Sequence, residues 1–93
     1  MQITFDPLKR GRALLERGLD FARAGEVFDG VTVTMQDHRQ DYGEPRFISV
    51  GQLDGELVVL VWTPRGWARR IISMRKANGR EIARYLPDLE RSR

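Results

Sequence analysis

The sequence predicts an α+β domain: an antiparallel, twisted sheet of about four or five strands, with two N-terminal helices and one C-terminal helix. Helical periodicity dominates up to about residue 28, whereas residues 31–76 form short alternating or apolar runs. Tight turns separate those runs, and a tight turn joins antiparallel strands. The chain of 93 residues has the length of one domain, so residues 1–93 are expected to fold as a single unit.

The first part of the chain predicts one strand and two helices. Residues 2–5 alternate polar and apolar side chains, as a short edge strand does. Asp6-Pro7 supplies a helix cap followed by proline at the first helical position, which predicts a helix over residues 7–17. A second helix is expected over residues 21–28, where apolar side chains recur at spacings of three and four.

The middle of the chain predicts the sheet. Residues 31–35 and 46–53 are rich in strand-forming residues and flank a polar loop over residues 36–45. Residues 56–63 are apolar on both faces and predict the central, most buried strand. The last strand is expected over residues 68–76, antiparallel to its predecessor.

Turn and capping residues complete the prediction. Asp54-Gly55 is a hairpin signal, and Pro64-Arg65-Gly66 predicts a second turn with proline at its first central position. Asn78 caps a final helix over residues 79–86. Pro87 is expected to end that helix and to leave a polar tail over residues 88–93.

Composition excludes several classes of protein. Hydrophobic residues make up 41% and charged residues 31%, a globular balance. The chain has no cysteine, which excludes disulfides and thiolate metal sites. No signal peptide is visible at the N-terminus, and the longest apolar run, residues 57–62, is too short to span a bilayer. We therefore expect a cytoplasmic protein without a membrane partner.

Arginine dominates the positive charge. The net charge is +3, and the cations are two lysines and fourteen arginines. A guanidinium grips phosphate with two parallel hydrogen bonds and stacks on bases, so this bias favours a nucleic-acid partner. A GC-rich genome would produce the same bias, and the sequence leaves both explanations open.

The last strand carries arginines at both ends. With simple alternation, one face is expected to carry Arg69, Ile71, Ser73 and Arg75. The other face is expected to carry Arg70, Ile72, Met74 and Lys76. These cations could merely reach water at the strand ends. If they act together, Arg46 and Arg65 should approach each other, with Arg75 further along the sheet.

Clustered arginines suit RNA cleavage, because RNA carries its own nucleophile, the 2′-OH, and needs only positioning, charge stabilisation and a proton carrier. Candidate proton carriers are His38, Glu81 with Tyr85, and Lys9. Each has an ordinary alternative: His38 as a solvated loop residue, and Glu81 as the capping carboxylate.

Other site types fit poorly. Asp37, His38, Asp41 and Glu44 match no metal-ligand spacing, so no metal or other cofactor is expected. Trp67 lies in a turn beside arginines and is the better candidate for stacking on a base, whereas Trp62 is expected in the core.

In order along the chain, these residues resemble the BrnT family of type II toxins. The matching segments are Phe5-Asp6-Pro7-Leu8-Lys9, Glu16 to Phe28, Glu44-Pro45-Arg46 with Gly51, Thr63-Pro64-Arg65, Arg70 to Ala77, and Glu81 with Tyr85. One departure is Glu16-Arg17, where the family usually has Lys-His.

The resemblance implies a fold similar to RelE-type toxins, metal-independent RNA cleavage that inhibits translation, and neutralisation by a BrnA-like antitoxin, with operator DNA bound only through the antitoxin complex. The expected catalytic residues are Arg65, Arg75, Glu81 and Tyr85. The expected RNA-binding residues are Lys9, Arg46, Arg70 and Trp67. Two alternatives remain: a non-catalytic nucleic-acid-binding module, such as an inactive toxin homologue, and a purely structural partner.

Overall fold

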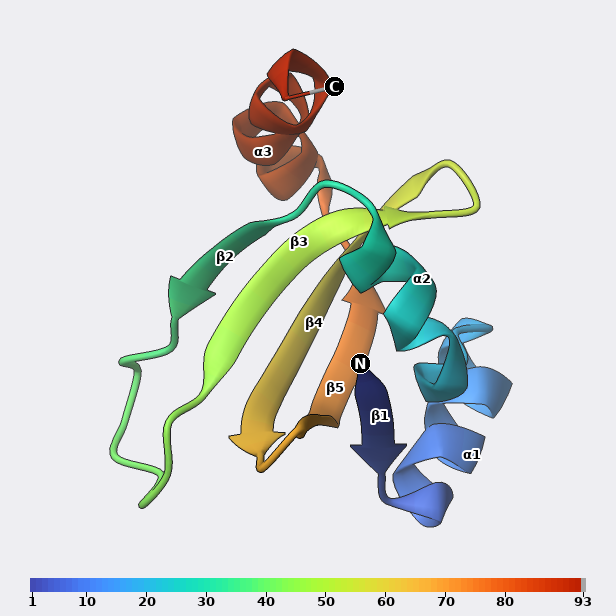
Figure 1. Cartoon of the computed structure of the whole chain (residues 1–93). Coiled ribbons are helices and arrows are strands. Elements are labelled where there is room, and N and C mark those ends of the chain that lie inside the picture. Colours follow the sequence, from blue (N-terminus) through green and yellow to red (C-terminus); the bar gives the residue numbers. More distant parts are fainter. Residues whose placement is uncertain (93) are drawn as a thin grey trace.

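The computed structural model describes residues 1–92 and contains a five-stranded sheet with helices on both faces (Figure 1). Along the chain the elements are β1 (Gln2–Phe5), α1 (Pro7–Arg17), the 3-10 turn η1 (Phe21–Arg23), α2 (Ala24–Asp29), β2 (Val33–Gln36), β3 (Phe47–Leu53), β4 (Glu56–Arg65), β5 (Ala68–Lys76) and α3 (Gly79–Arg91). The predicted α+β class and the arrangement of the helices are confirmed. No helix within residues 1–92 combines the length and apolar character needed to cross a bilayer.

The sheet has the strand order β1-β5-β4-β3-β2. Strands β2 to β5 pair antiparallel, as the turn signals predict. The expectation of a wholly antiparallel sheet is wrong at one edge, where β1 pairs parallel to β5, with Gln2 beside Ala68. Two helices and three strands separate β1 from β5 in the chain, so no hairpin sets their relative direction.

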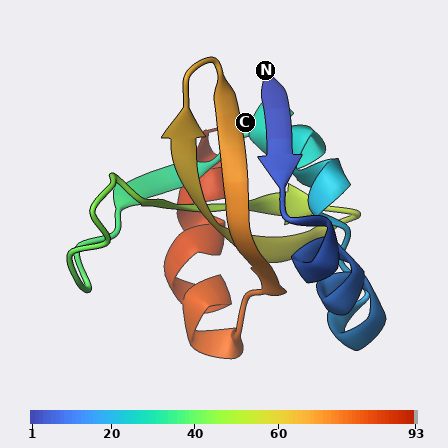
Figure 2. The same cartoon turned by 90° about the horizontal axis from the view of Figure 1, so that it is seen from below.

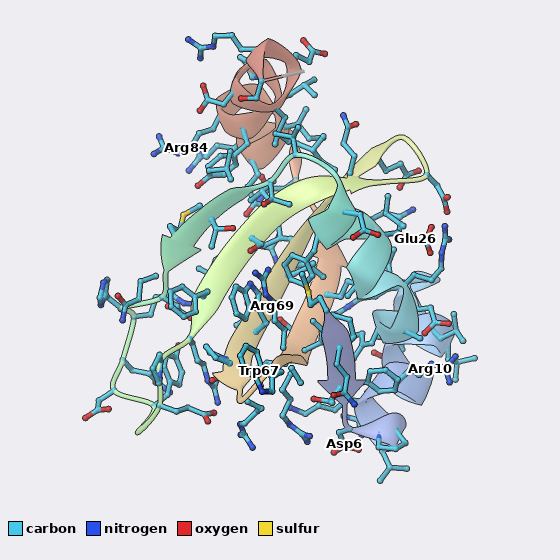
Figure 3. All side chains as sticks on the ribbon, in the orientation of Figure 1. Asp6, Arg10, Glu26, Trp67, Arg69 and Arg84 are labelled. Carbon is cyan, nitrogen blue, oxygen red and sulfur yellow. The ribbon has the colours of Figure 1, made fainter. Side chains whose placement is uncertain are left out.

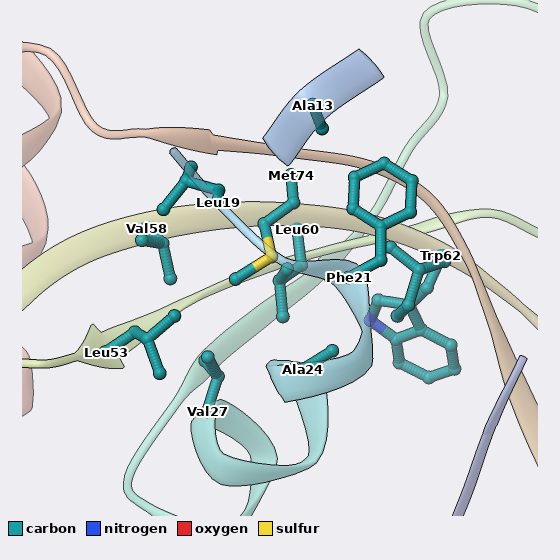
Figure 4. Close-up of a cluster of buried hydrophobic side chains, with 11 residues drawn as sticks. Ala13, Leu19, Phe21, Ala24, Val27, Leu53, Val58, Leu60, Trp62 and Met74 are labelled. Atoms are coloured by element: carbon teal, nitrogen blue, oxygen red, sulfur yellow. The ribbon is translucent and has the colours of Figure 1, made fainter. Parts of the chain in front are cut away.

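One face of the sheet packs against the N-terminal helices. Buried side chains from α1, η1 and α2 meet buried side chains from β3, β4 and β5 (Figure 4). Trp62 is part of this core, as expected, and its indole N–H donates to Ser49 Oγ at 2.8 Å. Gly51 is required here, because a Cβ at this position would lie 2.7 Å from Cγ1 of Val27.

The opposite face packs against α3, which lies apart from α1 in both views (Figures 1 and 2). The expectation that Pro87 ends this helix is wrong, because α3 continues to Arg91 with Pro87 inside it. The last turn contributes Leu89, which is buried with Val50, Leu57 and Val59. Burial of a leucine offsets the hydrogen bond that proline removes. The predicted polar tail is therefore helical through Arg91, and Arg93 lies outside the described residues.

Strand β5 contains a β-bulge that changes which residues share a face. Val61 pairs with Ser73 and Trp62 pairs with Ile71, so Ile72 is the extra residue. Simple alternation along this strand is therefore wrong: Ile71 and Met74, three residues apart, both lie in the same core. Arg69 shares that core face, where its guanidinium lies over Phe28 and Trp62.

The two hairpins differ in how well they were predicted. Asp54 and Gly55 both have positive φ, 52° and 79°, which matches the expected tight turn. Pro64 and Arg65 are not in a turn but in the last two positions of β4. Gly66, with φ 58°, and Trp67 make the turn instead.

Candidate active site

Arginines gather on the sheet face that α3 covers only in part. Paired residues on neighbouring strands lie on the same face. Arg75 pairs with Val59, which packs in the α3-side cluster, so Arg75 lies on this face. Arg70 and Arg65, across the bulge from Arg75, also lie on this face. Side chains alternate along each strand, and Ile71 and Trp62 point into the other core, which places Arg70 and Arg65 on the face of Arg75. The bulge thus groups Arg70, rather than Arg69, with Arg75.

A groove of about 290 Å³ lies between α3 and this face. Apolar residues form its floor, and polar groups approach from three directions. The polar lining residues are Arg39 from the β2–β3 loop, Ser73 and Arg75 from β5, and Glu81 and Tyr85 from α3. Three of the four predicted catalytic residues, Arg75, Glu81 and Tyr85, are therefore brought together.

Arg75 and Glu81 form a two-point ion pair. Arg75 donates from Nη1 and Nη2 to the two carboxylate oxygens of Glu81 at 2.7 and 2.8 Å. The same carboxylate accepts from the backbone N–H of Asn78 at 2.9 Å, and Asn78 caps the helix in return. Both expected roles of Glu81, in the site and in the cap, are present at once.

The ion pair sets the ionisation of Glu81. Hydrogen bonds from Arg75, helped by the Asn78 N–H, lower the pKa of Glu81 to about 2 against the opposing effect of burial. A general base is most effective when its pKa lies near the working pH. Glu81 is therefore a permanent anion that holds Arg75, and a weak proton acceptor.

Tyr85 is the other polar group that α3 presents to the groove. Its hydroxyl donates to the thioether sulfur of Met35 at 3.6 Å, a weak interaction that a better acceptor would displace. Tyr85 is half-buried and lines the groove. Ser73 shares the face of Arg75, as strand alternation predicts. The sequence did not single out Met35 or Arg39, which only tertiary structure brings to this place.

Arg46 and Arg65 meet at the opposite end of the same face, as expected. Both lie beside Glu44, with Arg65 Nη2 donating to Glu44 Oε2 at 3.0 Å. Arg46 Nε lies 3.9 Å from Glu44 Oε1. Arg65, predicted to act with Arg75, is not among the residues that line the Arg75 groove.

The remaining candidates lie elsewhere. Lys9 on α1 lines a separate recess of about 150 Å³ beside β5, which also contains Arg17 and Ser73. Trp67 is 97% exposed at the β4–β5 turn, with Arg69 on the sheet behind it (Figure 3). His38 lines a recess in the β2–β3 loop and is not among the residues of the Arg75 groove. Within residues 1–92, no three acidic or histidine side chains form a cluster able to hold a metal ion.

Comparison with known proteins identifies the family. The model of the ribonuclease toxin BrnT, of type II toxin–antitoxin systems, matches residues 5–81. That range contains Arg65, Arg75 and Glu81, whereas Tyr85 lies beyond it. No curated protein matches the chain. Because the match covers most of the chain and the fold described above, this protein belongs to the BrnT family of ribonuclease toxins of type II toxin–antitoxin systems.

Proposed function

We propose that this toxin cleaves RNA without a metal ion, on the arginine-bearing face of its sheet, by attack of a ribose 2′-OH on the adjacent phosphate. The observation that carries the proposal is the groove in which Arg75, Glu81 and Tyr85 converge. Such cleavage would inhibit translation. As a type II toxin the protein has a cognate antitoxin, which we propose is BrnA-like and binds operator DNA for the complex.

The reaction forms a bond between the 2′-oxygen and phosphorus and breaks the bond to the 5′-oxygen. A base takes the proton of the 2′-OH, and an acid supplies one to the 5′-oxygen. The products are a 2′,3′-cyclic phosphate and a 5′-hydroxyl. Negative charge builds up on the phosphate oxygens in the transition state, where a fixed guanidinium stabilises it most.

In this scheme Arg75 binds the transition-state phosphate and Glu81 keeps its guanidinium oriented. Tyr85 suits the role of acid, because its hydroxyl has only a weak sulfur acceptor to give up. The low pKa of Glu81 leaves it ionised at neutral pH, so it contributes little as a base. Arg65 adds positive charge from the far end of the face, and Lys9, Arg46, Arg70 and Trp67 bind the RNA on either side.

The test is cleavage of a defined RNA in EDTA by the wild type and by Arg75→Ala. Removing a group bonded mainly in the transition state lowers the rate by about 10²–10³. Arg80→Ala is the matched control, because Arg80 is an exposed arginine at the start of α3 and its loss changes the net charge equally. Cyclic phosphate ends and a loss confined to Arg75→Ala are expected. A requirement for metal, or an unchanged rate in Arg75→Ala, would refute the scheme.

The residues Glu16 and Arg17 are the feature that favours the non-catalytic alternative. Glu16-Arg17 replaces the Lys-His pair usual in the family, and Arg17 Nη1 donates to the backbone oxygen of Met74 at 3.0 Å. This contact ties α1 to β5, which is a structural use of the position. An inactive homologue would shift RNA in a gel, leave it intact and not arrest growth when expressed alone.

A further inference from the structure

The loop between β2 and β3 lines an open recess of about 590 Å³ that is separate from the groove containing Arg75. Tyr42, Glu44 and Arg46 line it, and Arg65 lies against Glu44 at its rim. An aromatic ring, a carboxylate and a guanidinium are the groups with which proteins stack on RNA bases and read their edges.

Arg46 has the geometry of a stacking surface rather than of a free phosphate ligand. Its guanidinium carbon lies over the Tyr42 ring, 4.0 Å from the ring centre, so the guanidinium packs against the ring. Among the described residues, the Arg46 Nε is the buried side-chain donor that has no hydrogen-bond partner. The 3.9 Å to Glu44 is too long for one. A buried donor without a partner is uncommon and marks a place that a ligand or water completes.

The support beneath this surface is rigid. Tyr42 donates its hydroxyl to Asp37 at 3.2 Å, and the Asp37 carboxylate is fully buried under a two-point contact from Arg39. The backbone N–H of Asp37 donates to the Arg46 carbonyl at 2.8 Å. The loop is thus held in one conformation by its own side chains, which suits a site that binds without reorganisation.

Glu44 is placed to read the edge of a base beside Arg46. Its side chain is 28% exposed, and Arg65 fixes one carboxylate oxygen from the side. Each carboxylate oxygen has two lone pairs, so both oxygens keep acceptor capacity. Guanine is the one RNA base whose Watson–Crick edge carries two neighbouring N–H donors, which match the two oxygens of a carboxylate.

We propose that this recess is a nucleobase subsite that selects guanine, with the base stacked on the Arg46 guanidinium and its N1–H and N2–H donating to Glu44. This rests on the proposed ribonuclease function and adds a base preference to it. Arg46 therefore contributes base stacking in place of the phosphate contact expected from the sequence. Its replacement by lysine, which cannot stack as a plane, is not conservative here.

The test measures binding of short fluorescent oligouridines that carry a single central G, A, C or U, using protein with Arg75→Ala so that the RNA stays intact. A good two-point contact to a base edge discriminates between bases, so the G-containing oligonucleotide should bind about tenfold tighter than the others. Glu44→Gln keeps the volume of the side chain but replaces one acceptor with a donor, and it should abolish this preference. Arg70→Ala, the matched control, should weaken binding of all four equally.

Equal affinities for the four oligonucleotides, or a guanine preference that survives Glu44→Gln, would overturn the subsite. Mapping of cleavage positions in a long RNA by the wild type needs no variant and should place cuts beside guanine. The two proposals fail separately. Guanine-selective binding without cleavage would support the subsite and refute the ribonuclease scheme. Cleavage without base preference would support the ribonuclease scheme and refute the subsite.

Discussion

Glu81 joins the candidate site to the stability of the fold, and Glu81→Gln separates its two functions. Glutamine keeps an oxygen that can accept from the Asn78 N–H, so the helix cap is preserved. It loses the negative charge that holds Arg75 in the groove. Any loss of stability in this variant therefore measures the ion pair rather than the cap.

The expected loss follows from the pKa. Arg75, with a smaller contribution from the Asn78 N–H, lowers the pKa of Glu81 from 4.5 to about 2, so about 3 kcal/mol, at 1.36 kcal/mol per pKa unit, is an upper bound for the ion pair. The side chain of Arg75 is 45% exposed and that of Glu81 22%. Solvent screens such a pair, so Glu81→Gln should lower the free energy of unfolding by about 1–2 kcal/mol at pH 7.

The sign of the pH dependence is fixed. A carboxylate with a depressed pKa in the folded state stabilises the protein above its unfolded-state pKa, and this contribution is lost as the pH falls through the folded-state value. The wild type should therefore lose its advantage over Glu81→Gln between about pH 4.5 and pH 2.

The measurement is urea unfolding of both proteins at neutral and acidic pH. Glu56→Gln is the matched control, because Glu56 pairs with Lys76 at 3.1 Å where both side chains are 57% exposed. It should cost less than about 0.5 kcal/mol at neutral pH. Equal losses in the two variants, or a loss in Glu81→Gln that persists unchanged at low pH, would refute this reasoning.

Three further predictions concern the fold and are read out by the same unfolding assay. Leu89→Ala should lower the free energy of unfolding by about 2–4 kcal/mol because Leu89 is buried. Leu15→Ala is the control and should change the stability little, because Leu15 is exposed. Equal effects of the two substitutions would mean that the last turn of α3 does not pack. Gly51→Ala should cost about 1–3 kcal/mol because its methyl group would meet Val27, and an unchanged midpoint would contradict that contact. Pro87→Ala should stabilise by about 1 kcal/mol or more by relieving the helix of proline, and a destabilised variant would show that Pro87 packs usefully.

Elements fixed by local chemistry were predictable from the sequence. The Asp54-Gly55 turn and the Asn78 cap each depend on residues within four positions of one another. The parallel pairing of β1 with β5 was not predictable, because it depends on where the chain returns after six intervening elements. The sequence predicts too short an α3, because proline disfavours helix locally, whereas the burial of Leu89 that extends the helix depends on tertiary structure.

The site was predictable in its residue types and not in its grouping. Arg75, Glu81 and Tyr85 were expected together, and they line one groove. Arg65 lies beside Glu44 with Arg46, as expected, but its distance from the Arg75 groove does not fit the expected joint catalytic role with Arg75. The polar composition of residues 36–45 is typical of a solvated loop, yet Asp37 in this loop is buried. Short i, i+2 contacts such as Asp37 with Arg39 leave no periodic signal in the sequence.

The β-bulge shows why residue type alone does not define this surface. Without the extra residue at Ile72, Arg69 would share a face with Arg75, and Arg70 would point into the N-terminal core. With it, the guanidinium of Arg69 packs over Phe28 and Trp62, where it stabilises the core on the face away from Arg75. Two adjacent arginines thus receive opposite roles from one unpaired backbone position. A sequence that kept both arginines but lost the bulge would keep its charge and lose the grouping of Arg70 with Arg75 on one face, so the register of β5 against β4 determines the proposed site.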